Sequence, residues 1–212
     1  MWLRRRAAWQ SPIIGRGPAL TVVLFAINLP RELVDLPDGS IGVRCPPEIA
    51  NAPRETFSPS MVARLGDWRF DDAYAQSNAD HSFTFATMDD LPEAYALKAS
   101  LRFAPGTREA GFVVHTTPDF RQGFQIFITS DQMGYQPLPR TFWVPPSPVR
   151  SHSLELTQPV EIQIYVEGTL VEVFLGGEVA MVSRAYNRSG RSLGFYARDG
   201  RVEWLNIQLQ RL

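Results

Sequence analysis

The chain has 212 residues, of which 21 are basic and 22 acidic, so its formal net charge is −1 at neutral pH. This balance gives no electrostatic reason to expect nucleic acid or an anionic membrane as a partner. The length suits one large all-β domain with a short extension. The single cysteine, Cys45, excludes an intrachain disulfide and favours the reducing cytoplasm, with secretion as the alternative.

The first 28 residues are predicted to be a lead-in. They open with M-W-L-R-R-R and contain the apolar run 19–27, A-L-T-V-V-L-F-A-I. At nine residues this run is shorter than the roughly 20 that a membrane helix needs. We expect a strand there. A signal segment stays the alternative, although polar and turn residues separate the basic start from the apolar run.

Residues 29–60 are predicted to form a linker segment. Arg31 to Arg44 is typical of two short strands around a turn at Pro37-Asp38-Gly39. The stretch from Cys45 to Pro59 then carries four prolines and favours an extended path. One helical turn at most fits between Glu48 and Arg54.

Residues 61–212 are predicted to fold as an all-β, two-sheet antiparallel β-sandwich of the concanavalin-like jelly-roll type. The clearest element is Val160 to Leu175, where β-branched residues alternate with polar ones around a turn at Glu167-Gly168-Thr169. We expect this hairpin near the centre of a sheet. Alternation predicts further strands over Gly66–Phe70, His81–Thr87, Tyr95–Phe103, Ala110–Thr116, Gly123–Thr129, Thr141–Val144, Glu178–Arg184, Arg191–Ala197 and Arg201–Leu212.

The last predicted strand follows a turn at Asp199-Gly200. Strict alternation places Val202, Trp204, Asn206 and Gln208 on one of its faces. Leu205, Ile207 and Leu209 then fall on the other face. We expect this strand to close a sheet.

The sequence offers little that predicts catalysis. Its three histidines lie far apart and in no metal-ligand spacing, and no G-x-S-x-G motif occurs. Glu161 and Glu172 are carboxylates that could face each other across the central hairpin, as a glycosidase requires. Both occupy polar positions of amphipathic strands, so we expect a structural role or a solvated side chain for each. No catalytic residue, metal ligand or cofactor is predicted.

Aromatic residues near predicted loops are the candidates for carbohydrate binding. Trp143 and Tyr135 could stack on a sugar ring through their apolar faces. Packing within the protein is the commoner use of such residues and stays open as the alternative.

Three segments resemble one known family. The central one is Val160 to Tyr186, V-E-I-Q-I-Y-V-E-G-T-L-V-E-V-F-L-G-G-E-V-A-M-V-S-R-A-Y. It resembles the C-terminal β-sandwich of glycoside hydrolase family 32, the invertases, fructanases and sucrose-6-phosphate hydrolases. Leu29 to Glu48 resembles the linker before that sandwich. Leu101 to Ile128 resembles its middle strands.

The resemblance implies a module without the family's catalytic machinery, and would make the lead-in 1–28 a remnant of a propeller strand. Family members carry their chemistry on a β-propeller with motifs of the types W-M-N-D-P-N-G, R-D-P and E-C, and none of the three occurs here. We therefore expect a non-catalytic module that supports or associates with a β-fructosidase propeller or forms a homodimer, through an apolar patch. The alternatives are a module that binds fructan or sucrose, and one subunit of a two-chain β-fructosidase.

Overall fold

The computed structural model describes residues 28–139, 149–186 and 190–212. The predicted strand over 19–27, and the strand over 141–144, lie outside these residues. The elements within them are β1 (Glu32–Asp35), β2 (Ile41–Arg44), α1 (Pro47–Ala50), β3 (Thr56–Phe57), β4 (Met61–Leu65), β5 (Asp67–Phe70), β6 (Ala75–Met88), β7 (Ala94–Phe103), β8 (Glu109–Thr116), β9 (Gly123–Ile128), β10 (Gln132–Leu138), β11 (Val149–Ser151), β12 (Val160–Glu167), β13 (Leu170–Leu175), β14 (Val179–Arg184) and β15 (Ser192–Arg211).

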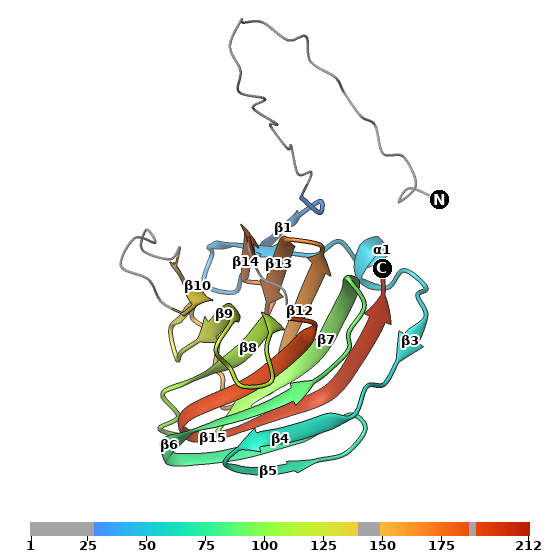
Figure 1. Ribbon diagram of the computed structural model, residues 1–212. Helices are drawn as coiled ribbons and strands as arrows, with labels where there is room; N and C mark the ends of the chain where they lie inside the picture. The colour runs from blue at the N-terminus through green and yellow to red at the C-terminus, as the bar shows by residue number, and fades with distance from the viewer. Residues whose placement is uncertain (1–27, 140–148, 187–189) are drawn as a thin grey trace, which may run out of the picture.

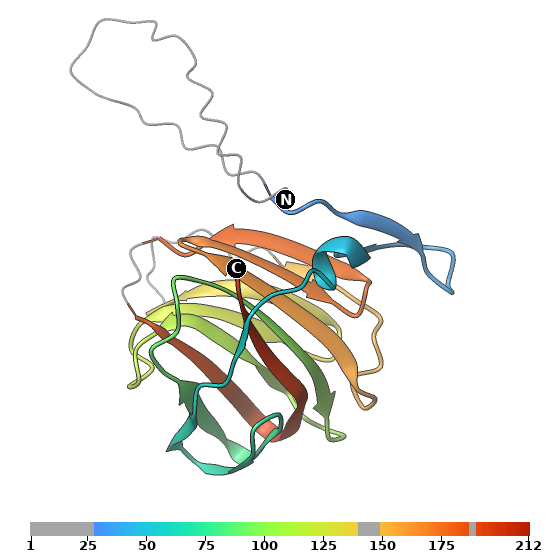
Figure 2. The same cartoon turned by 90° about the vertical axis from the view of Figure 1, so that its right-hand side faces the viewer.

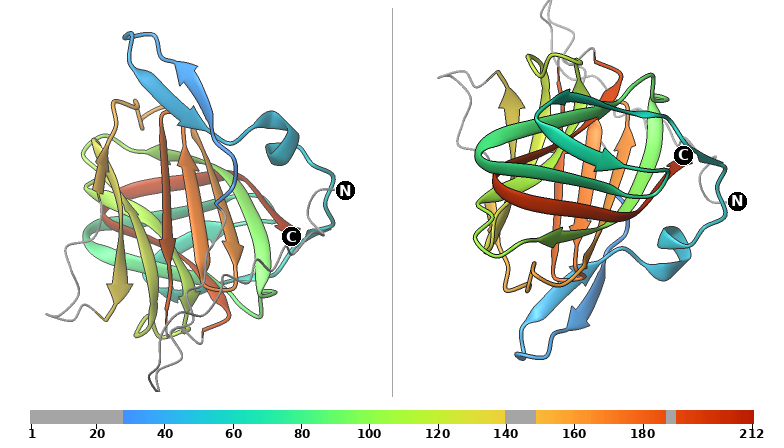
Figure 3. Two further views of the ribbon diagram at one scale, coloured as in Figure 1. Left: turned by 90° about the horizontal axis from the view of Figure 1, so that it is seen from above. Right: turned by 90° about the horizontal axis from the view of Figure 1, so that it is seen from below.

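Two antiparallel layers pack face to face, which confirms the predicted all-β sandwich (Figures 1 and 3). We call them sheet A, in the order β14-β13-β12-β7-β15-β6-β5, and sheet B, in the order β11-β10-β9-β8-β15-β6-β4. The long strands β6 and β15 belong to both sheets. The first part of β15 pairs with β8, and its second part pairs with β7.

The space between the sheets is filled by apolar side chains from alternate positions of both. Its largest fully buried members include Trp204, Phe112, Phe195, Leu97, Ile126 and Ile162. Trp204 is stacked on Trp68 with ring centroids 5.4 Å apart, and Phe195 meets its ring edge-on at 5.9 Å. These contacts hold the inner faces of the two sheets together. The alternate side chains of each strand therefore point to the outer faces.

The hairpin predicted at Val160–Leu175 is confirmed as β12 and β13. Val160, Ile162, Ile164 and Val166 all face the core, and Gly168 adopts a φ of 54° in the turn. The hairpin does not lie at the centre of its sheet, because only β14 separates β13 from the edge. The strands at the centre are β15 and β6. The sequence predicts only shorter strands within them.

The predicted turn at Asp199-Gly200 is wrong, since β15 continues through it. Instead a β-bulge interrupts the register between Arg198 and Gly200, and Asp199 has a φ of 50°. A bulge keeps a strand paired while bending it. This bend carries β15 from one sheet into the other. The Asp199-Gly200 pair therefore lies at a corner of the sandwich and not in a turn between two strands.

A second bulge settles which face of the last segment is buried. Between Leu205 and Gln208 the register with β7 shifts, and Asn206 has a φ of 54°. The extra residue inverts the alternation, so Val202 and Trp204 point inward before the bulge and Ile207 and Leu209 after it. Strict alternation therefore assigned Ile207 and Leu209 to the wrong face.

Residues 29–57, which we call the clasp, run along the outer face of sheet A (Figure 2). They contain the β1–β2 hairpin, confirmed at its predicted position, the short helix α1, and β3, which pairs with β15. Cys45 and Ala50 are buried in the clasp against Tyr165 and Phe174 of the hairpin β12–β13. The clasp is thus packed as part of the same folded body.

Candidate functional site

A buried carboxylate joins the start of the clasp to sheet A. Glu172 has 1% of its side chain exposed, and its Oε1 accepts a hydrogen bond from the Leu29 backbone N–H at 2.6 Å. The Arg31 guanidinium lies 4.0 Å from its Oε2. Burial raises the pKa of Glu172, while the Leu29 N–H and Arg31 act in the opposite direction. This arrangement holds the chain in place where it enters the sandwich.

The middle of the clasp is anchored by contacts of several kinds. The Cys45 Sγ lies 3.5 Å from the Tyr165 hydroxyl, and burial raises the pKa of this thiol. Lys98 donates to the Ala50 carbonyl, and the Arg54 guanidinium lies over the Tyr165 ring at 5.8 Å from its centroid. A buried thiol with a raised pKa is a poor nucleophile, which agrees with a structural role for Cys45.

The β1–β2 hairpin presents an apolar face to solvent. Leu33 and Ile41 are 68% and 66% exposed, and the register pairs Leu33 with Val43 and Ile41 with Asp35 on that face. Glu32 and Arg44 form an ion pair across the other side of the hairpin, at 2.9 Å. Exposed aliphatic side chains on a projecting hairpin can contact a partner protein.

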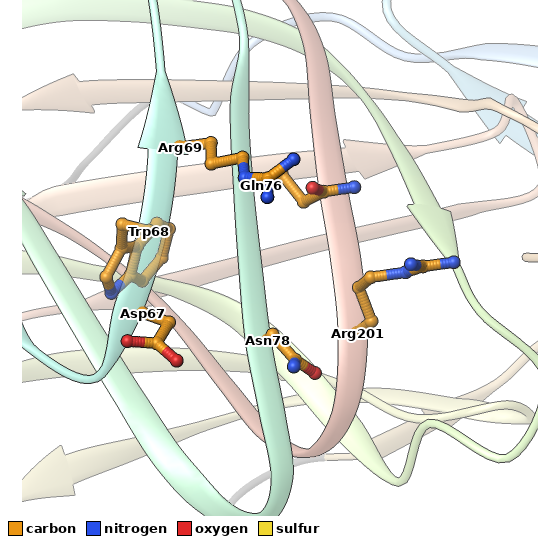
Figure 4. A pocket seen from close by; sticks show the side chains of 6 residues that line it. All are labelled: Asp67, Trp68, Arg69, Gln76, Asn78 and Arg201. Carbon is orange, nitrogen blue, oxygen red and sulfur yellow. The ribbon is translucent and has the colours of Figure 1, made fainter.

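The outer face of sheet A beyond the clasp is polar and carries two cross-strand rows. In the first row Asp67 of β5, Asn78 of β6 and Arg201 of β15 lie in register. Figure 4 shows Asn78 between the other two, with Arg201 extending away from β6. The three side chains are brought together by strand pairing, although they are far apart in the sequence.

The second row, next to the first, is internally paired. Arg69, Gln76, Glu203 and Arg102 follow one another across β5, β6, β15 and β7. Arg102 forms an ion pair with Glu203, and the Gln76 amide donates to Glu203 Oε1 at 3.0 Å. Glu203 is therefore already neutralised. Arg201 has no carboxylate within 4.0 Å in the part of the chain that the structure describes.

Three shallow depressions share Arg201. One, of about 390 Å³, is lined by Asp67, Trp68, Arg69, Gln76, Asn78 and Arg201 (Figure 4). A second, of about 310 Å³, lies toward Arg102, Pro105 and Thr157. A third, of about 400 Å³, lies over the first bulge of β15 and includes Asp80, His81 and Asp199. The side chains around them offer hydrogen-bond donors and acceptors beside exposed apolar atoms.

The two aromatic residues proposed from the sequence do not meet at this face. Tyr135 lies in β10, not in a loop; it is 1% exposed, and its ring packs 5.2 Å from that of Phe124. In this position the ring has no face open to a sugar. Trp143 lies outside the described residues, and its sugar-binding role stays a prediction. Trp68 and Phe103, not Tyr135, are aromatic residues that line the depressions around Arg201.

The two carboxylates considered for glycoside cleavage are not a pair. Glu161 is exposed and solvated, whereas Glu172 is buried and accepts from the Leu29 N–H, which is the structural role. Glu172 lies opposite Tyr165, four positions along β12 from Glu161. At ~3.3 Å per residue that offset is about 13 Å, beyond the ~5–10 Å separation that glycosidases use.

Other kinds of site find no support in the described residues. No group of three or more His, Cys, Asp and Glu side chains is placed to hold a metal ion there. Within those same ranges, no helix is both long enough and apolar enough to cross a membrane.

A match to a family model identifies the family of the chain. Residues 71–211 match the model described as glycosyl hydrolases family 32 C terminal. The chain belongs to this family. The family 32 C-terminal module accounts for two thirds of the sequence and covers both sheets from β6 to β15. A comparison with curated protein sequences gave no match.

Solved structures share the fold at low sequence identity. The carbohydrate binding module CBM66 from Bacillus subtilis matches with a TM-score of 0.60 and 11% identity, over 74% of this chain and 99% of its own. A fructosyltransferase from A. japonicus (TM-score 0.51, 14% identity) and an exo-inulinase from Aspergillus awamori (0.52, 12%) each match over 86% of this chain. These matches span only 31% and 34% of the two enzymes' own length.

Sequence reasoning missed Arg201 and its neighbours. Each sits at a polar position of an alternating strand, where a solvated side chain is the ordinary expectation. The Asp199-Gly200 pair predicts a turn, whereas the structure has a β-bulge at this position. Only the register of β5, β6 and β15 shows that these positions form one surface.

Proposed function

We propose that this chain is a non-catalytic module that supports or associates with a β-fructosidase propeller. The observation that carries the proposal is the family 32 C-terminal match over residues 71–211. The clasp adds to it, because Glu172 fixes the point at which Leu29 enters the sandwich. The exposed Leu33 and Ile41 beside that point give a propeller an apolar surface to contact.

The first test of this role is an assay for hydrolysis. The purified chain is expected to release no fructose from sucrose, inulin or levan, because the propeller motifs that the family uses are missing from its sequence. Turnover that co-purifies with the chain and survives removal of contaminants would overturn the non-catalytic assignment.

The second test addresses the surface. A family 32 propeller domain expressed without its own sandwich should bind the chain, and L33D combined with I41D should weaken binding by tenfold or more. L65D is the matched control, since Leu65 is 55% exposed but lies on β4. Equal loss in both variants would contradict a specific role for the hairpin. If the isolated chain self-associates through Leu33 and Ile41 instead, sedimentation will show a homodimer and the propeller assignment fails.

Carbohydrate binding is a second candidate function. It is favoured by the likeness to CBM66 over nearly the whole length of that module, and by the depressions around Arg201. Calorimetric titration with sucrose, fructose and a short inulin tests it: saturable heat supports binding, and flat titrations remove it. Cytoplasmic location, with secretion as the alternative, completes the proposal and is tested by cell fractionation.

A further inference from the structure

Arg201 occupies a position that the backbone holds rigidly. Its carbonyl oxygen accepts hydrogen bonds from the Ala104 N–H at 2.8 Å and from the Thr107 hydroxyl at 2.9 Å. Gly200, with a φ of 148°, lies so close to Thr107 that a Cβ on it would be 2.5 Å from the Thr107 Cα. The backbone of Arg201 is therefore already ordered, so only its side-chain rotamers need to be fixed when a ligand binds.

The backbone around this point is in an unusual conformation on two strands. Asp199 of β15 and His81 of β6 have φ angles of 50° and 52°, in the left-handed region that side chains other than glycine rarely adopt. Both residues line the depression over the bulge. Bulges and residues held in this region are frequent beside binding sites, where they direct side chains.

The neighbouring side chains supply complementary groups. With the Asn78 amide nitrogen turned toward Asp80, it donates to both carboxylate oxygens at 3.1 and 3.2 Å, which leaves the Asn78 carbonyl oxygen free to accept. Asp67 offers acceptors on one side of Asn78. Arg201 offers a planar set of donors on the other side. Because they lie on three neighbouring strands about 5 Å apart, together they can bind hydroxyl groups spread along a saccharide.

The charge of the surface indicates what kind of ligand fits. The charged groups that line the three depressions are four carboxylates, Asp67, Asp80, Asp199 and Glu203, and three guanidinium groups, Arg69, Arg102 and Arg201. Their sum is slightly negative, so the surface does not favour a polyanion. Depressions of about 300 to 400 Å³ are large enough for one or two sugar units.

We infer that Arg201, Asn78 and Asp67 form a binding site for a neutral saccharide on the outer face of sheet A. This inference rests on the second candidate function, carbohydrate binding, and locates its binding site. The Arg201 guanidinium donates to two ligand oxygens, and Asn78 and Asp67 accept from ligand hydroxyls.

The test is calorimetric titration of the full chain and three variants with sucrose, fructose and a short inulin, and with inorganic phosphate as the anionic probe. R201A and R201K should each weaken saccharide binding at least tenfold, since lysine keeps the charge but loses the planar donor pair. R121A is the matched control, because Arg121 is an exposed arginine in the loop before β9, and it should bind within twofold of the unchanged chain. Circular dichroism verifies that each variant is folded; Arg201 is exposed, so its removal leaves no cavity.

The outcomes separate the site from the function. Saccharide binding that R201A leaves intact overturns the site while carbohydrate binding stands. An unchanged chain that binds none of the saccharides removes both. Phosphate bound more tightly than the sugars, in an Arg201-dependent way, overturns the neutral ligand.

Discussion

Glu172 is a single residue on which the attachment of the clasp depends. Its carboxyl is buried beneath Leu29 and Arg31, and its Oε2 accepts no hydrogen bond from the described residues. A buried group of this kind must be satisfied or it costs stability. Replacing it tests hydrogen bonding and charge separately.

E172A should lower the free energy of unfolding by about 1–3 kcal/mol, because the Leu29 N–H loses its acceptor. E172Q keeps that acceptor and removes the charge. The folded-state pKa of Glu172 is raised above its ordinary value of 4.5. The folded protein therefore binds the proton more readily, and this stabilisation is present below pH 4.5 and lost as pH rises through the raised pKa. E172Q should flatten that decline in urea unfolding measured over pH 4 to 8; an unchanged pH profile would contradict the role of Glu172.

Trp204 is the second residue with a measurable consequence. It is completely buried between Trp68 and Phe195. W204A should lower the free energy of unfolding by about 3–5 kcal/mol through loss of packing and a new cavity. W68A, in which a half-buried ring is removed, should cost less. Guanidinium unfolding followed by circular dichroism measures both, and a larger cost for W68A would contradict this account of the core.

At the scale of elements, the second bulge of β15 determines which side chains reach the core. Asn206 carries the left-handed backbone that the bulge requires. N206V should destabilise the protein by about 1–2 kcal/mol, because a β-branched residue is strained in this region. N206G should be tolerated. Thermal unfolding of the two variants checks the order, and equal melting temperatures would mean that the bulge relaxes at no cost.

How far alternation predicts this fold is clear from particular strands. It located β12, β13 and β7 because one face of each is continuously apolar. It missed β10, where Gly134 and Pro137 interrupt the pattern and resemble loop residues. Since each bulge changes the phase by one residue, β15 could be found from the sequence, but the inward face of its second half could not.

The sequence indicates the class of ligand for the candidate site but not the residues that form it. The family resemblance indicated a carbohydrate-related module, yet the aromatic residues chosen for it were Trp143 and Tyr135. The ring of Tyr135 fills the core, because alternation along β10 turns it inward. Asp67, Asn78 and Arg201 become neighbours only through strand register, which depends on contacts distant in sequence.

At the scale of the whole molecule, the shared strands predict a single unfolding transition. Because β6 and β15 are part of both sheets, neither sheet can lose its central strands alone. Far-ultraviolet circular dichroism and tryptophan fluorescence should give coincident urea curves. Separate midpoints for the two signals would show that the sheets unfold independently.

The sharing of β15 also determines when, during synthesis, the sandwich can finish folding. Every other described strand is synthesised first, yet β6, β7 and β8 lack their central neighbour until residues 192–211 have been added. Until then, the edges of these three strands are exposed to pairing with other chains. The closing contacts are distant in sequence, which makes folding slow. A nascent chain of this module therefore has a period in which chaperone protection matters most, and that period ends with its last strand.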